Sequence, residues 1–413
     1  MASVLRAFLK RIIQKGTLEV EAADGERFRI GDGTGSLVAI RFSDRAAERQ
    51  LLLNPALAFG ELFTDSRIVV TRGSIYDVLE LASSNLTVHE PPGLAKALTT
   101  FRTALRRIEQ RNGRQRAKRN VAHHYDFDDR LYDLFLDADR QYSCAYFEQT
   151  GQSLEDAQLA KKRHIAAKLL TEPGQSVLDI GCGWGGLALY LAEFCDAEVI
   201  GITLSEEQLK IARLRAKQRN LATRAKFRLQ DYRTVPERFD RIVSVGMFEH
   251  VGVGYYNAFF DNAARRLAND GVMLLHSIGR MDGPSSTNPW IAKHVFPGGY
   301  IPALSEVLPA IERAGLVVTD IEILRLHYAE TLRAWRGRFL ARREDAKALY
   351  GERFCRLWEF YLAASECSFR HSGLMVFQIQ LARRQDAVPL TRNYVTQREA
   401  ALRAKDCSQV AAE

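Results

Sequence analysis

The sequence predicts an α/β protein in which a doubly wound, Rossmann-like sheet follows a small N-terminal α+β domain. Three observations predict this fold. After about residue 121, short apolar runs alternate with longer helical segments, which is typical of parallel strands joined by crossover helices. The run VLDIGCGWGG at residues 177–186 is an apolar strand that enters a glycine-rich turn. Before residue 100, short alternating runs broken by glycine indicate a separate, smaller domain.

The N-terminal domain is expected to begin with an amphipathic helix at residues 1–16. Such a helix either docks on its own domain, which we favour, or lies in a membrane interface. Between residues 17 and 82, runs such as TLEVEAADGERFRIG and IVVTRGSIY predict short strands. The apolar face of the helix contains Val4, Leu5, Phe8, Leu9, Ile12 and Ile13, and its basic face contains Arg6, Lys10, Arg11 and Lys15.

A basic segment separates the two domains. Residues 101–120 read FRTALRRIEQRNGRQRAKRN and hold eight basic residues against one acid, Glu109. This charge suits anionic lipid or RNA, and it equally suits a solvated linker helix, so the segment alone leaves both interpretations open. We therefore expect a small domain at 1–100 that is a candidate for membrane contact, a basic linker at 101–121, a larger domain at 122–390 and a tail at 391–413.

The larger domain is expected to contain seven strands with helices between them. Each strand is predicted by a short apolar run bounded by polar or glycine-rich segments. The last two strands are separated by a long helical stretch, which fits a final hairpin-like pair. The predicted strands are Ser176–Ile180, Glu198–Ile202, Lys226–Leu229, Arg241–Val245, Val272–Ser277, Val317–Leu324 and Leu374–Leu381.

Composition narrows the class of protein. The chain has 413 residues and a net charge of +8, which favours an anionic partner such as nucleic acid or an acidic membrane. Six scattered cysteines, with no CxxC pair and no secretory leader, predict reduced thiols in the cytoplasm. No apolar stretch approaches the ~20 residues of a bilayer span, so we expect at most peripheral contact with a membrane.

The glycine-rich turn predicts a nucleotide cofactor. Glycine supplies positive φ and bare backbone, and the following helix offers free N–H groups to a polar ligand. Gly181, Gly183 and Gly186 satisfy the dinucleotide pattern GxGxxG. With Asp179 and Gly185, the same run also satisfies the DxGxGxG pattern of S-adenosylmethionine methyltransferases. The glycines alone therefore leave NAD and S-adenosylmethionine open.

Neighbouring positions favour S-adenosylmethionine. A dinucleotide fold usually ends its second strand in an acid that holds the ribose hydroxyls, but here the end of that strand reads Gly201-Ile202-Thr203-Leu204 and contains no acid. Gln208, one turn into the next helix, could contact the ligand at the position that the acid usually occupies. Asp179 could hold the ammonium group of S-adenosylmethionine, while Asp231 and Tyr232 after the third strand offer an adenine acceptor and a stacking ring.

Seven motifs occur in order and at consistent spacing in the larger domain. They are QYSCAYF at 141–147, DIGCGWGG at 179–186, GITLSEEQ at 201–208, VSVGMFEHVG at 243–252, LLHSIG at 274–279, NPWIAKHVFPGG at 288–299 and HYAETLRAW at 327–335. Together they resemble the cyclopropane-fatty-acid synthase family, which includes the mycolic acid cyclopropane synthases. The resemblance runs from about residue 122 to about residue 384, and residues before 120 resemble the N-terminal domain of the longer bacterial synthases only loosely.

The resemblance implies a reaction. In this family S-adenosylmethionine gives its methyl carbon to the cis double bond of an acyl chain in a membrane phospholipid, and proton loss closes a cyclopropane ring. The alkene is a weak nucleophile and a carbocation forms, so the site must orient the methyl group and exclude water. The family uses a bound bicarbonate as base. Aromatic rings that could stabilise the cation are Tyr142, Tyr146, Phe147 and Phe248.

The resemblance also implies the roles of individual residues. Glu249 would accept the bicarbonate hydroxyl, and His276 and Tyr328 would donate to the bicarbonate oxygens. Cys144 and Val245 would contribute chiefly backbone groups. The cofactor would be contacted by Tyr142, Ser143, Gly181, Gly183, Thr203, Leu204, Gln208, Asp231 and Tyr232, with Asp179 and Gly185 of the glycine-rich turn beside them.

The partners follow from the same resemblance. We expect membrane phospholipids with unsaturated acyl chains as substrate, peripheral association with the inner, anionic face of the membrane, and neither nucleic acid nor a metal. The sequence leaves a homodimer open. A related fatty-acid C-methyltransferase that makes methyl-branched or methylene acyl chains is the alternative, although the intact bicarbonate cradle favours ring closure.

Three other classes of function fit less well. Residues 288–290, Asn-Pro-Trp, are similar to the [DN]PP[YF] loop of nucleic-acid amino-methylases, but that loop should follow the fourth strand. Cys144 and a histidine such as His276 could form a nucleophilic pair, yet the family has no covalent step and the thiol would need a lowered pKa. A non-catalytic lipid-binding protein would be expected to have lost the glycine-rich turn or the bicarbonate cradle.

Overall fold

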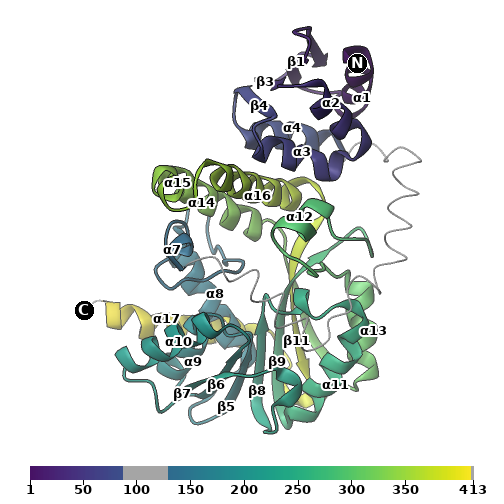
Figure 1. The fold of residues 1–413 in the computed structure, drawn as a ribbon. Helices are drawn as coiled ribbons and strands as arrows, with labels where there is room; N and C mark the ends of the chain where they lie inside the picture. Colours follow the sequence, from purple (N-terminus) through teal and green to yellow (C-terminus); the bar gives the residue numbers. More distant parts are fainter. Residues whose placement is uncertain (87–128, 411–413) are drawn as a thin grey trace. The chain divides into compact units, whose positions relative to one another are not determined.

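The computed structural model describes residues 1–86 and 129–410, which form two compact units (Figure 1). The sheet unit comprises residues 129–284, 298–328 and 375–410. The N-terminal unit comprises residues 1–86, 285–297 and 329–374, so two segments from within the region 122–390 belong to it. The basic segment predicted as a linker at 101–121 lies outside the described residues.

The sheet unit is built on a seven-stranded, mostly parallel sheet in the order β10-β11-β9-β8-β5-β6-β7. The pairs β5–β6, β6–β7, β5–β8 and β8–β9 are parallel, whereas β10 and β11 are antiparallel. The predicted doubly wound, Rossmann-like sheet is therefore confirmed (Figure 1). The strands are β5 (Ser176–Ile180), β6 (Glu198–Thr203), β7 (Ala225–Leu229), β8 (Phe239–Val245), β9 (Leu267–Arg280), β10 (Val317–Leu324) and β11 (Leu374–Ala382).

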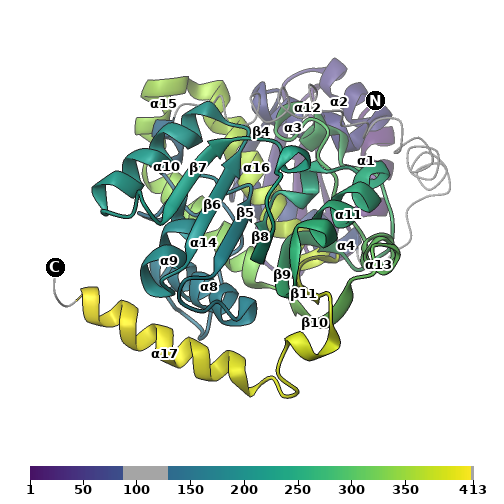
Figure 2. The ribbon, with the colours of Figure 1, turned by 90° about the horizontal axis from the view of Figure 1, so that it is seen from below.

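Alternate residues of the central strands face two separate apolar cores, because successive side chains of a strand point to opposite faces. Val177 of β5 packs with helices on one face, whereas Leu178 and Ile180 pack with helices on the other. Figure 2 shows the two groups of helices on either side of the strands. The first group contains α8 (Leu154–Leu169), α9 (Gly186–Phe194) and α10 (Glu206–Gln218), and the second contains α11 (Tyr256–Arg266) and α13 (Leu304–Arg313).

Short helices and a final long helix complete the sheet unit. The long helix α17 (Asn393–Val410) packs along α8. α10 begins directly after Ser205, whose hydroxyl accepts a hydrogen bond from the Gln208 backbone N–H, as expected for an N-cap serine. The short helices are α7 (Asp129–Tyr132), η1 (Tyr232–Thr234), η2 (Phe248–His250), η3 (Val253–Tyr255) and η4 (Gln385–Ala387).

The N-terminal unit contains the predicted small α+β domain. Its four strands are ordered β2-β1-β3-β4, with β1 and β3 parallel and the other pairs antiparallel. Four helices from later in the chain, α12 and α14–α16, also belong to this unit. The first two residues of α14 are an exception and belong to the sheet unit. The elements are α1 (Ala2–Ile12), β1 (Thr17–Glu21), β2 (Arg27–Gly31), β3 (Leu37–Phe42), α2 (Arg45–Leu53), α3 (Pro55–Thr64), β4 (Ile68–Arg72), α4 (Ile75–Leu86), α12 (Pro289–His294), α14 (His327–Ala341), α15 (Arg343–Tyr350) and α16 (Glu352–His371).

The amphipathic helix α1 docks on its own domain. Leu5 and Leu9 are buried in the apolar core that the N-terminal strands form, together with Ile13 just after the helix. The basic side chains Lys10 and Arg11 remain exposed. The docked arrangement is the one that the sequence favoured. Across residues 1–86 and 129–410, no helix combines the length and apolar character that a membrane span requires.

Candidate functional site

The glycine-rich turn lies at the carboxyl edge of β5, between that strand and α9. Gly181 has a φ of +84°, and a Cβ atom placed on it would lie 2.8 Å from the Met247 Cβ. Gly185 also has a φ of +84°, and its Cβ would meet the Phe227 ring at 2.8 Å. Both positions therefore require glycine, but for different reasons: Gly181 lines a pocket, whereas Gly185 caps α9 and allows it to pack closely on Phe227.

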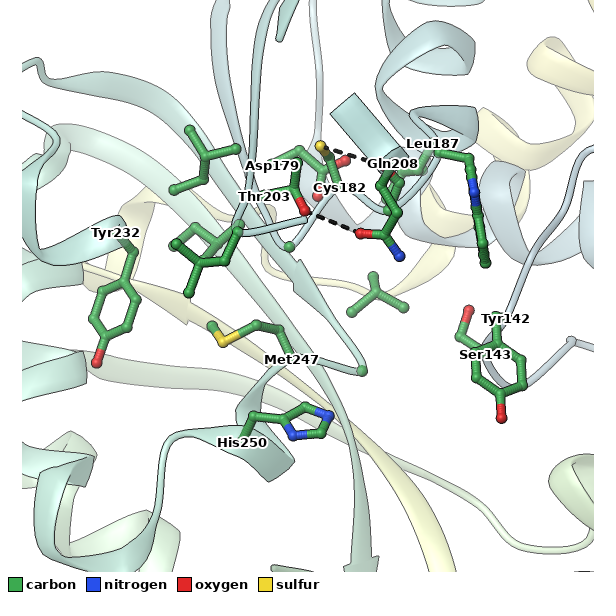
Figure 3. A pocket seen from close by; sticks show the side chains of 18 of the residues that line it. Tyr142, Ser143, Asp179, Cys182, Leu187, Thr203, Gln208, Tyr232, Met247 and His250 are labelled. Carbon is green, nitrogen blue, oxygen red and sulfur yellow. Dashed lines mark hydrogen bonds between the residues drawn. The ribbon is translucent and has the colours of Figure 1, made fainter. Parts of the chain in front are cut away.

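A pocket opens at this edge of the sheet, entirely within the sheet unit (Figure 3). Every predicted cofactor contact except Gly185 lines it, and so does Val245 of the predicted bicarbonate cradle. Lys161, Met247 and His250, which the sequence analysis did not select for the cofactor, line it as well. The predicted contacts that line the pocket are Tyr142, Ser143, Asp179, Gly181, Gly183, Thr203, Leu204, Gln208, Asp231 and Tyr232.

Gln208 is held where a dinucleotide fold would place an acid. The Thr203 hydroxyl donates to Gln208 Oε1 over 2.9 Å, as Figure 3 shows. Thr203 Oγ1 in turn accepts from the backbone N–H of Ser205 over 3.1 Å. Because the amide oxygen is already engaged, Gln208 presents its N–H donors to the pocket. A ribose hydroxyl can accept from such a donor.

Asp179 and Asp231 both line the pocket, but they differ in their partners. Asp179 is 2% exposed, and its Oδ2 has no hydrogen-bond partner within the described part of the chain. Burial raises the pKa of Asp179 to about 7, although the Lys161 ammonium acts in the opposite direction. Asp231 instead forms a bidentate ion pair with Arg233, with Nε donating to Oδ1 over 2.8 Å and Nη2 to Oδ2 over 2.5 Å. Asp179 is thus the acid that is suited to a cationic ligand group.

Glu249 follows β8, on the short helix η2. Its Oε1 accepts from the backbone N–H of Ile278 on β9 over 2.7 Å. Its Oε2 is buried and has no hydrogen-bond partner among residues 1–86 and 129–410. Burial raises the pKa of Glu249 to about 7, against the lowering effect of the Ile278 hydrogen bond. A buried carboxyl oxygen without a partner is costly, so this geometry suits a ligand that donates a hydrogen bond.

His276 lies on β9 directly opposite Val245 of β8. Its Nδ1 is 3.2 Å from the amide Nε2 of Gln378. When that amide donates to Nδ1, the ring proton is on Nε2, which is buried and has no partner in the described structure. Burial lowers the pKa of His276 to about 3, so the ring is neutral at physiological pH. His276 therefore offers one unused N–H donor near the end of β8.

Of the other predicted cradle residues, Cys144 and Tyr328 are buried and Val245 is half-buried. Cys144 is 1% exposed, and its thiol donates to the Ala145 carbonyl oxygen over 3.3 Å. Val245 lines the pocket, and Tyr328 is 9% exposed at the start of α14. The engaged thiol of Cys144 agrees with a contribution through the backbone rather than through sulfur chemistry.

The aromatic candidates have different surroundings. Tyr142 lines the pocket. Phe248 is fully buried and stacks on Tyr256 with ring centroids 4.5 Å apart, in the core beneath α11. Tyr146 stacks on His164 of α8 at 4.1 Å. Phe147 donates its backbone N–H to the His327 ring over 3.0 Å. Of these four rings, Tyr142 is the one that the pocket exposes to a ligand.

Within residues 1–86 and 129–410, no group of three histidine, cysteine or acidic side chains is arranged to hold a metal ion. The buried polar atoms without a hydrogen-bond partner in the described structure include three near the carboxyl edge of the sheet: Asp179 Oδ2, Glu249 Oε2 and His276 Nε2. The two carboxyl oxygens suit ligand groups that donate hydrogen bonds, and the imidazole nitrogen, when protonated, suits a ligand group that accepts one.

Comparison with known proteins gives consistent matches. Residues 112–379 match the family model described as mycolic acid cyclopropane synthetase. The chain is 35% identical over 377 residues to the cyclopropane-fatty-acyl-phospholipid synthase of Escherichia coli K12, covering 88% of this chain and 96% of that protein. It is 42% identical over 267 residues to a probable fatty acid methyltransferase of Pseudomonas putida, covering 63% of this chain and 68% of the relative.

The fold also matches a solved structure. Mycolic acid cyclopropane synthase CmaA1, complexed with SAH and CTAB, superposes with a TM-score of 0.60 at 35% identity. The match covers 64% of this chain and 97% of that chain.

Proposed function

This chain belongs to the cyclopropane synthase family, and we propose that it converts the cis double bond of an unsaturated phospholipid acyl chain into a cyclopropane ring. As a member of that family, the protein is an S-adenosylmethionine-dependent methyltransferase. The observation that most supports the proposed ring closure is the pair of buried polar atoms without described partners, Glu249 Oε2 and His276 Nε2.

The pocket residues can bind the two halves of the cofactor separately. S-adenosylmethionine, when bound, supplies a sulfonium methyl carbon that a carbon–carbon double bond can attack. The amide donors of Gln208 and the bare backbone of Gly181 and Gly183 suit the nucleoside half. The carboxylate of Asp179 suits the ammonium group of the methionine half. Fixing the methyl group in one orientation removes an entropic part of the barrier for a weak nucleophile.

Glu249 and His276 fit a bound bicarbonate, because that ion needs both a donor and an acceptor in a dry site. His276 Nε2 can donate to a bicarbonate oxygen, and Glu249 Oε2 can accept from the bicarbonate hydroxyl. Bicarbonate held there would supply the base that removes a proton from the transferred methyl carbon. We propose that Cys144, Val245 and Tyr328 complete this cradle.

The cradle favours ring closure over the related products. A ring forms when a base takes a proton from the carbon that has just been transferred, whereas a methyl-branched or methylene chain requires a different fate for the cation. The buried environment of Glu249 and His276 also excludes water, which would otherwise trap the cation. The related fatty-acid C-methyltransferase activity remains the alternative.

We also propose peripheral contact with the anionic inner face of a membrane, because a phospholipid substrate is confined to the bilayer. The net charge of +8 and the basic segment 101–120 support this contact. Replacing Arg102, Arg106, Arg107, Arg111, Arg114 and Arg116 by Ser should weaken co-sedimentation with anionic vesicles at low salt. Unchanged co-sedimentation of this variant would leave the segment as a linker only.

A product assay tests the proposed reaction. The full-length protein is incubated with S-adenosylmethionine, bicarbonate and vesicles of a phospholipid that carries cis-unsaturated chains, and the released fatty acids are analysed by gas chromatography and mass spectrometry. We expect an acyl chain that is one CH₂ unit heavier and co-elutes with a cyclopropane standard. A branched methylene isomer of the same mass but different retention would support the alternative and exclude ring closure as the main outcome.

A further inference from the structure

A buried lysine lies in the wall of the cofactor pocket. Lys161, on α8, is 1% exposed and lines the pocket. Its Nζ donates to Gln141 Oε1 over 2.7 Å and to Ser143 Oγ over 2.8 Å. One turn earlier on the same helix, Gln158 Nε2 donates to the backbone carbonyls of Gln141 and Ser143. α8 therefore holds both the backbone and the side chains of the pocket segment 141–143.

The hydrogen bonds of Lys161 leave one N–H donor of its ammonium group and the hydroxyl donor of Ser143 unused. An ammonium group has three N–H donors, and two of them are engaged by Gln141 and Ser143. Because Ser143 Oγ accepts from Lys161, the Ser143 hydroxyl proton must be donated elsewhere, and the described residues give it no acceptor. Both groups line the pocket, so a pair of donors with a positive charge behind it awaits an acceptor there.

The same pocket holds the opposite charge. Asp179 Oδ2 is buried without a hydrogen-bond partner in the described structure, and the Lys161 charge is close enough to lower the pKa of Asp179. Burial lowers the pKa of Lys161 itself to about 8, so the side chain is still mainly charged at neutral pH. The pocket thus presents a cation with a hydroxyl donor, and a carboxylate, to one ligand.

The methionine half of S-adenosylmethionine is a zwitterion that matches this arrangement. We propose that Lys161, directly and through the Ser143 hydroxyl, binds the carboxylate of that half, while Asp179 binds its ammonium group. Charge-assisted hydrogen bonds of this kind are stronger than neutral ones and fix direction. Lys161 then selects cofactors that carry the amino-acid carboxylate. This inference rests on the S-adenosylmethionine chemistry of the family and not on the lipid substrate, so its failure would leave the proposed ring closure untouched.

Lys162 provides a matched control on the same helix. It is also mostly buried, and its Nζ pairs with Asp139 Oδ2 over 2.7 Å, but it does not line the pocket. Asp139 keeps Arg215 as a second cationic partner when Lys162 is lost. Lys161→Met and Lys162→Met therefore remove the same charge from neighbouring positions of α8, only one of which faces the ligand.

The experiment compares two ligands by calorimetry: S-adenosylmethionine and its decarboxylated analogue, which keeps the amine and the sulfonium but lacks the carboxylate. We expect Lys161→Met to weaken S-adenosylmethionine binding by about ten- to a hundredfold and to leave binding of the analogue within about twofold. Lys162→Met should leave the ratio of the two affinities as in the wild type. Equal weakening of both ligands by Lys161→Met would show that Lys161 only supports the segment, and would overturn the proposal.

Ser143→Ala covers the case in which Lys161→Met does not fold. It keeps the buried lysine and its bond to Gln141, and it removes only the hydroxyl donor. We expect a selective but smaller loss of S-adenosylmethionine affinity, with binding of the decarboxylated analogue retained. If Ser143→Ala does not change the ratio of the two affinities, the carboxylate is bound elsewhere.

Discussion

Two clusters of buried polar side chains in the sheet unit differ in whether their charges are matched. The site cluster contains Asp179, Glu249 and His276, each with one buried atom that has no described partner. The α8 layer lies between α8, β10 and α17, and each of its charged side chains has an oppositely charged partner, although Asp406 Oδ1 itself has no hydrogen-bond partner in the described structure. Its ion pairs are Arg163–Asp406 at 2.8 Å, His164–Glu322 at 2.7 Å, His164–Glu399 at 2.6 Å, Lys168–Glu322 at 2.8 Å and Lys168–Asp320 at 3.2 Å.

This difference distinguishes buried polar side chains that are suited to bind a ligand from those that stabilise the fold. Folded proteins pair nearly all their buried polar atoms, so the exceptions need an explanation. In the α8 layer the partners come from distant parts of the chain and join α8 to α17 on one side and to β10 on the other. In the site cluster the missing partners can be supplied by a cofactor and an anion. Substitutions in the two clusters should therefore act on different measurements.

The largest expected effect is the loss of turnover in Glu249→Gln. This change keeps the size of the side chain but removes the charge and the acceptor arrangement that would hold bicarbonate. Since general-base catalysis contributes about 10²–10⁴-fold, we expect cyclopropane formation to fall by that factor in the vesicle assay. S-adenosylmethionine binding, measured by calorimetry, should stay near the wild-type value. Near-normal turnover would show that the proton leaves by another route.

The next effect is on stability, in the α8 layer. Asp406→Asn removes the charge that faces Arg163, whose side chain is 7% exposed. The buried Arg163 charge would then keep only the more distant Glu148 carboxylate, 3.7 Å away, so the free energy of unfolding, measured by urea denaturation, should fall by up to about 3 kcal/mol. The exposed pair Arg384–Asp386 is the control, and Asp386→Asn should have a clearly smaller effect on the free energy of unfolding, because solvent screens that pair. If Asp406→Asn and Asp386→Asn lowered the free energy of unfolding equally, the ion pairs of the α8 layer would not be specifically important for stability.

A third substitution, Asp179→Asn, should lower the affinity for S-adenosylmethionine without lowering the thermal stability of the protein. Loss of the carboxylate should weaken S-adenosylmethionine binding by about tenfold, since one charge-assisted hydrogen bond is lost. The melting temperature of the ligand-free protein should be unchanged or higher, because a buried carboxyl oxygen without a described partner is removed. A clear fall in melting temperature with unchanged affinity would place Asp179 among the structural groups.

The smallest effect is a pH dependence that His164 confers. Glu322 and Glu399 raise the pKa of His164 despite its burial, and Lys168 opposes them. A histidine whose pKa is raised on folding adds stability that is full below its ordinary value near 6.5 and disappears as pH rises through the folded value. The stability difference between wild type and His164→Gln, on the order of 1 kcal/mol, should therefore shrink from pH 6 upwards. A difference that grows with pH would contradict this assignment.

Much of the sheet was predictable because its strands are short apolar runs, and most residues of β5, β9 and β11 are buried. β5 and β10 have the predicted bounds, Ser176–Ile180 and Val317–Leu324. β9 is longer than the predicted Val272–Ser277, because pairing of Leu267 with Phe239 extends it through a segment whose Asn, Asp and Gly residues favour turns. Tertiary pairing is not visible in local sequence patterns.

The site was only partly predictable for a similar reason. The glycine-rich turn and the family motifs brought together most of the residues that line the pocket. Lys161 gave no signal, because a lysine in the run LAKKRH normally indicates a solvated helix face. Its burial depends on segment 141–143, which packs on α8 through contacts that no helical periodicity encodes.

The long sequence separation within the α8 layer has a consequence for biosynthesis. Arg163 and Asp406 are 243 positions apart, and His164 and Glu399 are 235 apart. α17 is translated after every other described helix and strand. Until α17 has emerged from the ribosome, Arg163 lacks Asp406 and His164 lacks Glu399, so we expect the charges of α8 to be fully paired only at the end of synthesis. A nascent chain of this protein therefore has a built-in late step, and a premature stop codon before residue 399 would leave Arg163 and His164 without the counter-charges that α17 supplies.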